Sequence, residues 1–226
     1  DTTLRGADYH SVANVQTSGV VNAFWQAEIQ AQSSGKIGGK MLEPGLYDSF
    51  DINRTGRKQQ VSLTYENGAP KLYADPVYST NGFEVKPEEQ KNTLDPLSAL
   101  TFIVSSVAAQ GGNPCELTAP VFDGRRRYNI EMHKVKDTEI KMDNGLYAGK
   151  AALCQIKYRA IAGMRPGVLK RANDNFPAVN AWIVSYPASG GRSFAVPVRI
   201  WADTPYGQLS VVADQVKIDG QTVKGS

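Results

Sequence analysis

The sequence predicts an all-β, mainly antiparallel fold: a rolled or barrel-like sheet with one amphipathic helix over about residues 95–109. Three observations support this prediction. Apolar and polar residues alternate in many short segments, and this period of two is typical of half-buried antiparallel strands. Turn-forming residues separate these segments at short intervals, which is typical of barrels, sandwiches and rolled sheets. Only one segment combines helical spacing of apolar residues with clear start and stop signals.

Strand patterns dominate the N-terminal part of the chain. From residue 23 to residue 32, small or apolar residues alternate with glutamine and glutamate, so this strand has one apolar and one polar face. Residues 46–52 are predicted as a second strand, and residues 61–65 alternate in the same way. Asn67 and Gly68 follow directly. This dipeptide favours a tight hairpin, because both residues tolerate a positive φ angle.

A long surface loop and then a helix are predicted next. Residues 75–93 are mostly polar and contain two prolines. Asp95 is a favourable N-cap residue, and Pro96 occupies the first helical position, where its missing N–H removes no hydrogen bond. Four apolar residues follow at helical spacing: Leu97, Leu100, Val104 and Val107. Gly111 and Gly112 end the segment, and the helix is expected to pack its apolar side against a sheet or plug its mouth.

Strand patterns resume after Cys115 and continue almost to the C-terminus. Alternating segments, with turn residues between them, occupy residues 128–133, 152–159, 179–186, 194–201 and 209–218. The total is about ten to twelve strands at short spacing. No internal repeat or linker divides them. We therefore predict a single β domain over residues 1–226, with residues 1–7 and 219–226 as flexible tails.

The composition argues against two classes of partner. The net charge is +3 and the basic residues form only short clusters, whereas a nucleic-acid-binding surface needs clustered basic residues interleaved with aromatics. Mean hydropathy is −0.35, and no apolar run approaches the about 20 residues that cross a bilayer. We expect neither a nucleic-acid partner nor a transmembrane segment. The chain starts at Asp1 without an apolar leader, which predicts a product whose signal peptide has been removed.

The two cysteines allow three interpretations. Cys115 and Cys154 are 39 positions apart and belong to no CxxC motif, which argues against most zinc and thioredoxin-like sites. They could form a disulfide, remain two unlinked buried thiols, or include one reactive thiol. A disulfide would require an oxidising compartment and would stabilise the fold by about 4 kcal/mol.

Several segments together are similar to a known family. They are Leu94 to Leu100, Cys115, Pro120 to Tyr128, Tyr147 to Gly149, Cys154, Ile161 to Gly163, Pro197 to Ile200, and Thr204 to Gly207. In this order they resemble the bacterial exported family called domain of unknown function 3108 (DUF3108). The resemblance implies an all-β protein of a Gram-negative-type envelope, located in the periplasm, with a cysteine pair at Cys115 and Cys154. It implies no reaction and no cofactor.

Motifs for catalysis and metal binding do not stand out. The two histidines, His10 and His133, are far apart in sequence and have no partner ligands nearby. No GxSxG elbow or phosphate-binding glycine loop is present. We therefore expect no catalytic residue, no metal and no cofactor. An unrecognised hydrolase would need a serine or threonine within hydrogen-bonding reach of one of these histidines.

The segment from Phe122 to Tyr128 is the best candidate binding feature. Asp123-Gly124 is a turn signal, and alternation from Tyr128 back through Arg126 predicts that Arg126 points inward with Tyr128. A buried guanidinium needs a partner. Arg126 either anchors an anionic head group or pairs with an acidic side chain such as Asp123. Trp25, Trp182 and Trp201 are weaker candidates, since they could line an apolar interior or simply fill the core.

These observations lead to one functional hypothesis and two alternatives. We expect a non-enzymatic periplasmic envelope protein that binds a lipid-like, amphiphilic ligand, or the apolar segment of an envelope partner, in a concave face of its sheet. The first alternative is a structural or protein-interaction module that acts through its outer surface. The second is the hydrolase. The oligomeric state is not encoded in any pattern that we find.

Overall fold

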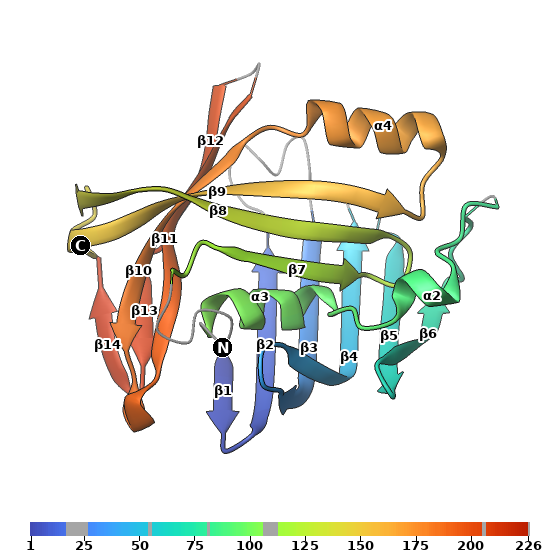
Figure 1. Ribbon diagram of the computed structural model, residues 1–226, viewed down its shortest axis with the longest axis horizontal. Helices are drawn as coiled ribbons and strands as arrows, with labels where there is room; N and C mark the ends of the chain where they lie inside the picture. Colours follow the sequence, from blue (N-terminus) through green and yellow to red (C-terminus); the bar gives the residue numbers. More distant parts are fainter. Residues whose placement is uncertain (17–26, 54–55, 81, 106–112, 205–206, 226) are drawn as a thin grey trace. The chain divides into compact units, whose positions relative to one another are not determined.

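The computed structural model describes residues 1–226 except 17–26, 54–55, 81, 106–112, 205–206 and 226 (Figure 1). Within the described residues, 14 strands form two six-stranded sheets and one separate hairpin. This confirms the all-β, mainly antiparallel fold with a helix. The strands of the described residues do not, however, form one rolled or barrel-like sheet: they divide among three sheets, and no closed barrel is found among them.

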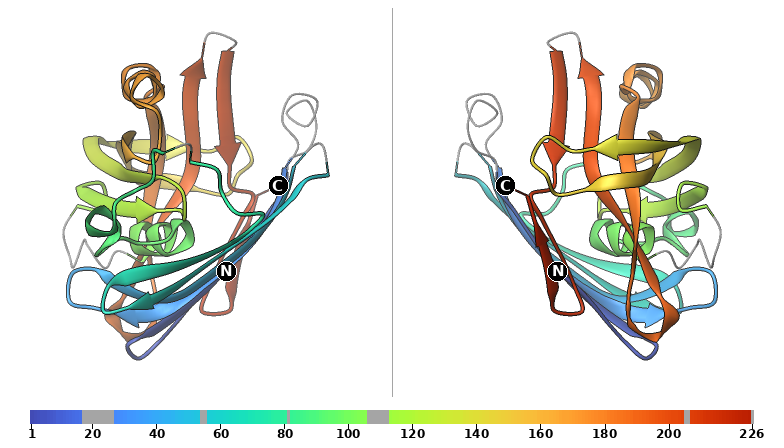
Figure 2. Two further views of the ribbon diagram at one scale, coloured as in Figure 1. Left: turned by 90° about the vertical axis from the view of Figure 1, so that its right-hand side faces the viewer. Right: turned by 90° about the vertical axis from the view of Figure 1, so that its left-hand side faces the viewer.

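The first sheet is a meander in which every strand pairs antiparallel with its neighbour in sequence. Its strands are β1 (Thr2–Arg5), β2 (Asp8–Gln16), β3 (Ala27–Ile37), β4 (Leu42–Asn53), β5 (Lys58–Glu66) and β6 (Ala69–Asp75). Figure 2 shows this sheet almost edge-on as a single layer. The register shifts between Ser34 and Gly35, where β3 passes Pro44 of β4.

The second sheet has the order β12-β11-β10-β9-β8-β7, so β12 and β7 are its edges. Its strands are β7 (Leu117–Phe122), β8 (Arg127–Lys141), β9 (Ala148–Ala162), β10 (Val179–Pro187), β11 (Ser193–Thr204) and β12 (Gly207–Val212). Strands β13 (Gln215–Ile218) and β14 (Gln221–Lys224) form the separate hairpin. Both segments that were expected to be flexible tails, residues 1–7 and 219–226, contain a paired strand: β1 in the first and β14 in the second.

Three α-helices occur in the described part of the chain: α2 (Pro87–Gln90), α3 (Pro96–Val104) and α4 (Pro166–Asn175), with a short 3₁₀ turn at Ser189–Gly191. Helix α3 begins at Pro96 as predicted, and the Asp95 carboxylate accepts the backbone N–H groups of Leu97 and Ser98. The expected end of this helix near residue 109 lies outside the described residues. None of these helices has the length and apolar character needed to span a bilayer.

The chain divides into two compact units. Unit 1 comprises Asp1–Thr101, Ala119–Tyr128 and Ala160–Lys170, and unit 2 comprises the rest. The apolar core of unit 1 consists of Tyr47, Val61, Leu63, Val85, Leu97 and Phe122. Unit 2 has two apolar clusters, one around Cys115, Cys154 and Ile183, and one around Val184, Val198 and Met142. The single domain that the sequence predicts stays a prediction.

Candidate functional site

A pocket of about 480 Å³ in unit 1 combines apolar walls with an arginine. The walls come from β6, the loop after it and the end of β7, and include Leu72, Val77, Tyr78, Val85 and Phe122. Val77 is 86% exposed, so the rim leaves apolar surface open to water. We call this site the Arg125 pocket.

Arg125 is the positively charged residue that lines this pocket. Its guanidinium carbon lies 5.7 Å from the centroid of the Tyr78 ring, which is within the range of a cation–π contact. Its Nε is buried and has no hydrogen-bond partner among the described residues. The described residues also show no carboxylate in an ion pair with Arg125. The site therefore contains a buried donor that the described residues leave unsatisfied, an arrangement that costs about 1–3 kcal/mol.

The turn before β8 explains why Arg125, and not Arg126, lines the pocket. Asp123 Oδ1 accepts the backbone N–H groups of Arg125 and Arg126 at 2.9 and 2.6 Å. Gly124, which lies between Asp123 and Arg125, has a φ of +90°. Strand β8 begins only at Arg127, so residues 123–126 do not follow the period of two. The prediction that Arg126 points inward is wrong, because Arg126 is exposed.

Two glycines bring the backbone of this turn close to its neighbours. A Cβ on Gly124 would lie 2.9 Å from Leu72 Cδ1 and 3.0 Å from Val61 Cγ1. A Cβ on Gly163 would lie 2.2 Å from the carbonyl oxygen of Arg125, and the φ of Gly163 is +87°. Both positions require glycine, since a side chain would collide and a positive φ is strained for other residues. The position of Arg125 therefore depends on Gly163, far along the chain.

A carboxylate also lines the pocket. Glu84 is exposed, lines the pocket and accepts a hydrogen bond from the Thr80 hydroxyl. This hydrogen bond lowers the pKa of Glu84 below its usual value. The pocket therefore has a positive side at Arg125 and a negative side at Glu84, which would orient a polar ligand.

A second, larger hollow of about 980 Å³ lies at the β3–β4 end of the first sheet. Its wall includes Tyr9, Gly35, Leu42, Tyr65 and Thr93, and we call it the Tyr9 groove. The Tyr9 ring approaches Gly35 so closely that a Cβ there would lie 2.9 Å from the ring and 2.3 Å from a backbone oxygen of β4. The register shift at Gly35 therefore shapes this groove.

Behind the groove, α3 meets the first sheet through hydroxyl groups. Tyr9 and Ser33 from the sheet, and Asp95 and Ser98 at the start of α3, are all buried. Ser98 Oγ lies 2.6 Å from the Tyr9 hydroxyl and 2.7 Å from Ser33 Oγ. Asp95 Oδ2 lies 3.1 Å from Ser33 Oγ and also contacts Ser98 Oγ. We call these four residues the Asp95 ring. The sequence identified Asp95 only as an N-cap.

Burial dominates the electrostatics of this ring. It raises the pKa of Asp95 from 3.8 to about 6, although hydrogen bonds from Ser98 and Ser33 act in the opposite direction. Burial also raises the pKa of Tyr9 to about 12, as it does for Tyr47. Among the described residues, the printed hydrogen-bond donors to the Asp95 carboxyl are hydroxyl and backbone N–H groups, which are neutral.

The tryptophan candidates lie in unit 2 as far as they are described. Trp182 and Trp201 make an edge-to-face pair with centroids 5.3 Å apart, and the Arg199 guanidinium carbon is 5.3 Å from each ring. Trp182 packs on the second apolar cluster of unit 2. Trp25 lies outside the described residues. Tyr128 is half-buried at the start of β8 and belongs to unit 1, so the described candidates are divided between the two units.

The two histidines lie at the surface of the part of the chain that the structure describes. Both are exposed, and His133 Nδ1 lies 3.6 Å from Glu116 Oε2. No hydroxyl hydrogen-bonds either histidine within the described ranges. Among these residues, no three His, Cys, Asp or Glu side chains gather closely enough to hold a metal.

Comparison with family models gives a match over most of the chain. The model described as "Protein of unknown function (DUF3108)" matches residues 1–214. The chain belongs to the DUF3108 family. No curated protein and no solved structure matches it. The DUF3108 match ends before β13, so the β13–β14 hairpin lies beyond it.

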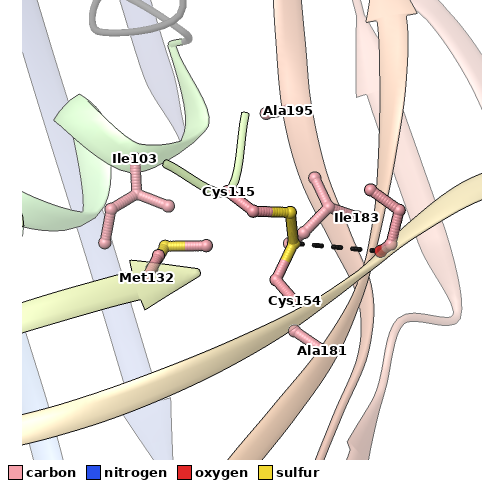
Figure 3. Packing of buried hydrophobic residues seen from close by; sticks show 8 residues of the cluster. Ile103, Cys115, Met132, Cys154, Ala181, Ile183 and Ala195 are labelled. Carbon is pink, nitrogen blue, oxygen red and sulfur yellow. Dashed lines mark hydrogen bonds between the residues drawn. A yellow bond between two sulfur atoms is a disulfide. The ribbon is translucent and has the colours of Figure 1, made fainter. Parts of the chain in front are cut away.

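The cysteine pair implied by the DUF3108 resemblance is a disulfide. Cys115 and Cys154 are both fully buried, with Cα atoms 5.5 Å apart (Figure 3). Ile103, Met132, Ala181, Ile183 and Ala195 surround the bond. Of the three interpretations of the cysteines, the structure contains the first. A disulfide is compatible with an extracytoplasmic location, because such bonds persist in oxidising compartments.

Proposed function

We propose that this DUF3108 protein is a non-enzymatic periplasmic protein that binds an amphiphilic ligand in the Arg125 pocket. The ligand class is a single-chain, lipid-like molecule with an anionic head group, such as a carboxylate or phosphate. One observation supports this choice above the others: a buried, unpartnered Nε of Arg125 lies beside open apolar walls. A carboxylate or phosphate would supply the missing acceptor, and guanidinium binds both groups with two parallel hydrogen bonds.

The dimensions and chemistry of the pocket fit this ligand class. Small-molecule sites usually measure about 300–1,000 Å³ and combine mainly apolar walls with a few polar groups. Burying an alkyl chain against Leu72, Val77 and Phe122 would contribute about 25 cal/mol per Å² of apolar surface. Glu84 would repel an anion, so the head group is expected on the Arg125 side of the pocket.

Displacement of a neutral apolar probe, N-phenyl-1-naphthylamine, tests this proposal. Laurate and dodecyltrimethylammonium carry the same alkyl chain with opposite head charges. We expect laurate to displace the probe at the lower concentration. Arg125→Gln should weaken laurate binding about 10- to 100-fold, because one charge-assisted hydrogen-bonding group is lost. Arg126→Gln, an exposed position in the same turn, is the matched control and should change little. Equal effects of both substitutions would contradict the proposal, as would no displacement by laurate.

The compartment can be tested separately. If the protein is periplasmic, alkylation in denaturant without reductant, directly after acid quenching of the cells, should leave Cys115 and Cys154 unmodified, and osmotic shock should release the protein. Modified thiols in freshly isolated native protein would contradict a periplasmic location.

The second candidate is an interaction module, and the edge strand β12 favours it. All six residues of β12 are exposed and none is charged, and Leu209 and Val211 are 61% and 70% exposed. Natural proteins usually protect such edges, because an unpaired strand accepts an extended segment of a partner. A photo-crosslinker at Val211 should then give a partner adduct in cells, whereas one at exposed Val135 on β8 should not. Equal labelling at both positions would remove this candidate.

A further inference from the structure

The Asp95 ring has more hydrogen-bonding contacts than hydroxyl protons. Four contacts link its members: Tyr9 with Ser98, Ser33 with Ser98, Ser33 with Asp95 and Ser98 with Asp95. Each contact needs one proton between its two oxygens. The three hydroxyl groups supply three protons, and an ionised carboxylate supplies none. One contact is therefore left without a proton when Asp95 is charged.

A neighbouring chain of hydroxyls shows that this deficit is specific to the ring. Thr2 contacts Ser11 at 3.0 Å, Ser11 contacts Thr101 at 2.7 Å, and Thr101 donates to the carbonyl oxygen of Leu97 at 2.9 Å. Here three hydroxyl protons serve three contacts, so every donor has one acceptor. The same interface between α3 and the first sheet thus contains one complete hydroxyl chain and one ring that is a proton short.

The two oxygens of Asp95 have different surroundings. Oδ1 accepts the backbone N–H groups of Leu97 and Ser98 at 3.0 and 2.8 Å, which suits the carbonyl oxygen of an acid. Among the described residues, the contacts of Oδ2 are with the hydroxyls of Ser33 and Ser98. If Oδ2 carries a proton, it donates to Ser98, Ser98 donates to Ser33, and Ser33 donates back to Oδ2. The Tyr9 hydroxyl then donates to Ser98, and all four contacts have their proton.

We propose that Asp95 is a proton-binding site of the folded protein, in which the neutral carboxylic acid completes the ring and its ionisation loosens the attachment of α3 to the first sheet. The titratable groups that face Asp95 are tyrosines: Tyr9 from β2, Tyr47 from β4 and Tyr65 from β5. No lysine, arginine or histidine compensates an ionised Asp95 within the described residues. The raised pKa of Asp95 is consistent with this assignment.

The protonation state of Asp95 also affects the Tyr9 groove, through Tyr9. The Tyr9 hydroxyl belongs to the ring, while its aromatic ring forms part of the groove wall next to Gly35. Loss of the proton leaves one contact of the ring unsatisfied, and the buried oxygens involved repel each other. Unit 1 thereby acquires a pH-sensitive element that does not depend on the Arg125 pocket.

Urea unfolding between pH 4 and pH 7 tests the proposal. An acid whose pKa is higher in the folded than in the unfolded protein favours folding at low pH, and this advantage disappears as the pH rises through the folded-state pKa. Asp95→Asn keeps this position neutral at every pH, while the amide oxygen can cap α3 and the NH₂ group can donate to Ser33 and Ser98. Relative to Asp95→Asn, the wild-type unfolding constant should rise about 50-fold from pH 4 to pH 7.

Asp123→Asn is the matched control, since Asp123 also accepts two backbone N–H groups but lies in a half-buried turn outside the ring. It should retain the wild-type pH dependence. Infrared difference spectra of the wild-type protein provide a second measurement that requires no stable variant. A carboxylic acid band that persists at pH 6, where carboxyl groups of ordinary pKa are ionised, and is lost by pH 8 would support the proposal. Identical pH dependence in wild type and Asp95→Asn, or a carboxylate without an acid band at pH 6, would overturn it.

Discussion

The two units of this protein are stabilised by different kinds of interaction. In unit 1, α3 attaches to the sheet through buried hydroxyl groups, with the Asp95 ring at the centre, and through Leu97 in the apolar core. In unit 2, the corresponding centre contains the disulfide and the aliphatic side chains around it. Hydrogen bonds are directional and depend on protonation, whereas apolar burial depends on neither.

This difference predicts different sensitivities. Unit 2 should tolerate changes of pH but respond strongly to loss of its covalent link or of packed volume. Unit 1 should respond to pH and to the removal of single hydroxyls. Both hollows that we describe also lie in unit 1, where polar groups and glycines interrupt apolar packing. The following predictions test this contrast, from the largest expected effect to the smallest.

Removing the disulfide should have the largest effect. The double substitution Cys115→Ala and Cys154→Ala opens a loop with a sequence separation of 39 and should lower the free energy of unfolding by about 4 kcal/mol. Urea denaturation of both proteins measures this change. Hydrogen exchange should locate the loss in residues 129–159 of unit 2. Unchanged stability, or faster exchange confined to unit 1, would contradict the comparison.

Gly163→Ala should be the most damaging single backbone change near the Arg125 pocket. The new Cβ would collide with the Arg125 carbonyl, and the φ of +87° is strained for alanine. We expect a loss of about 3 kcal/mol in the free energy of unfolding, together with weaker laurate binding. Gly167→Ala is the control, because Gly167 lies in α4 with open space around its Cα. Similar losses for both variants would show that the close approach is unimportant.

Two tyrosine hydroxyls offer a direct comparison between the units. The Tyr9 hydroxyl in unit 1 contacts Ser98, whereas the Tyr186 hydroxyl in unit 2 is buried without a partner among the described residues. Tyr9→Phe should therefore lower the free energy of unfolding by about 1 kcal/mol, and Tyr186→Phe should leave it unchanged or raise it. Thermal denaturation of the two variants measures both values. The opposite order would refute the assigned roles.

The smallest effect is expected at the surface of unit 2. Arg159 Nε lies 2.8 Å from Glu131 Oε1, and the Arg159 side chain is 61% exposed. Glu131→Gln should change the free energy of unfolding by less than about 1 kcal/mol, and added salt should reduce the difference further. Chemical denaturation at low and high ionic strength checks this expectation. A larger, salt-independent loss would mean that this ion pair contributes as much as a buried interaction.

Local signals in the sequence predicted several elements correctly. Asn67 and Gly68 have φ angles of 51° and 74° and connect β5 to β6, as expected for a hairpin dipeptide. Asp95 and Pro96 begin α3 as predicted. These signals work because they act between residues that are neighbours along the chain. The short helix α2 inside the expected loop was missed, since four residues carry too little periodicity to be recognised.

The candidate site was only partly predictable. The sequence indicated the arginine turn, but counting alternation backwards from Tyr128 selected Arg126 where the structure selects Arg125. A turn held by Asp123 does not continue the strand period, and Gly124 was the signal that could have shown this. For the Asp95 ring, the available signal was Ser98, which follows Asp95 by three residues and therefore lies about one helical turn away from it.

By itself, the sequence determined the strand-rich fold, the start of α3, the DUF3108 family and the pairing of its cysteines as that family implies. Tertiary structure alone decided the division into separate sheets, the choice of Arg125 and the composition of the Asp95 ring. Tyr9 and Ser98 are 89 positions apart, so no local pattern could show that they share a proton network. Periodicity predicts which face of a strand or helix a side chain lies on. A binding site or a hydrogen-bond network depends instead on which residues from distant parts of the chain contact that side chain.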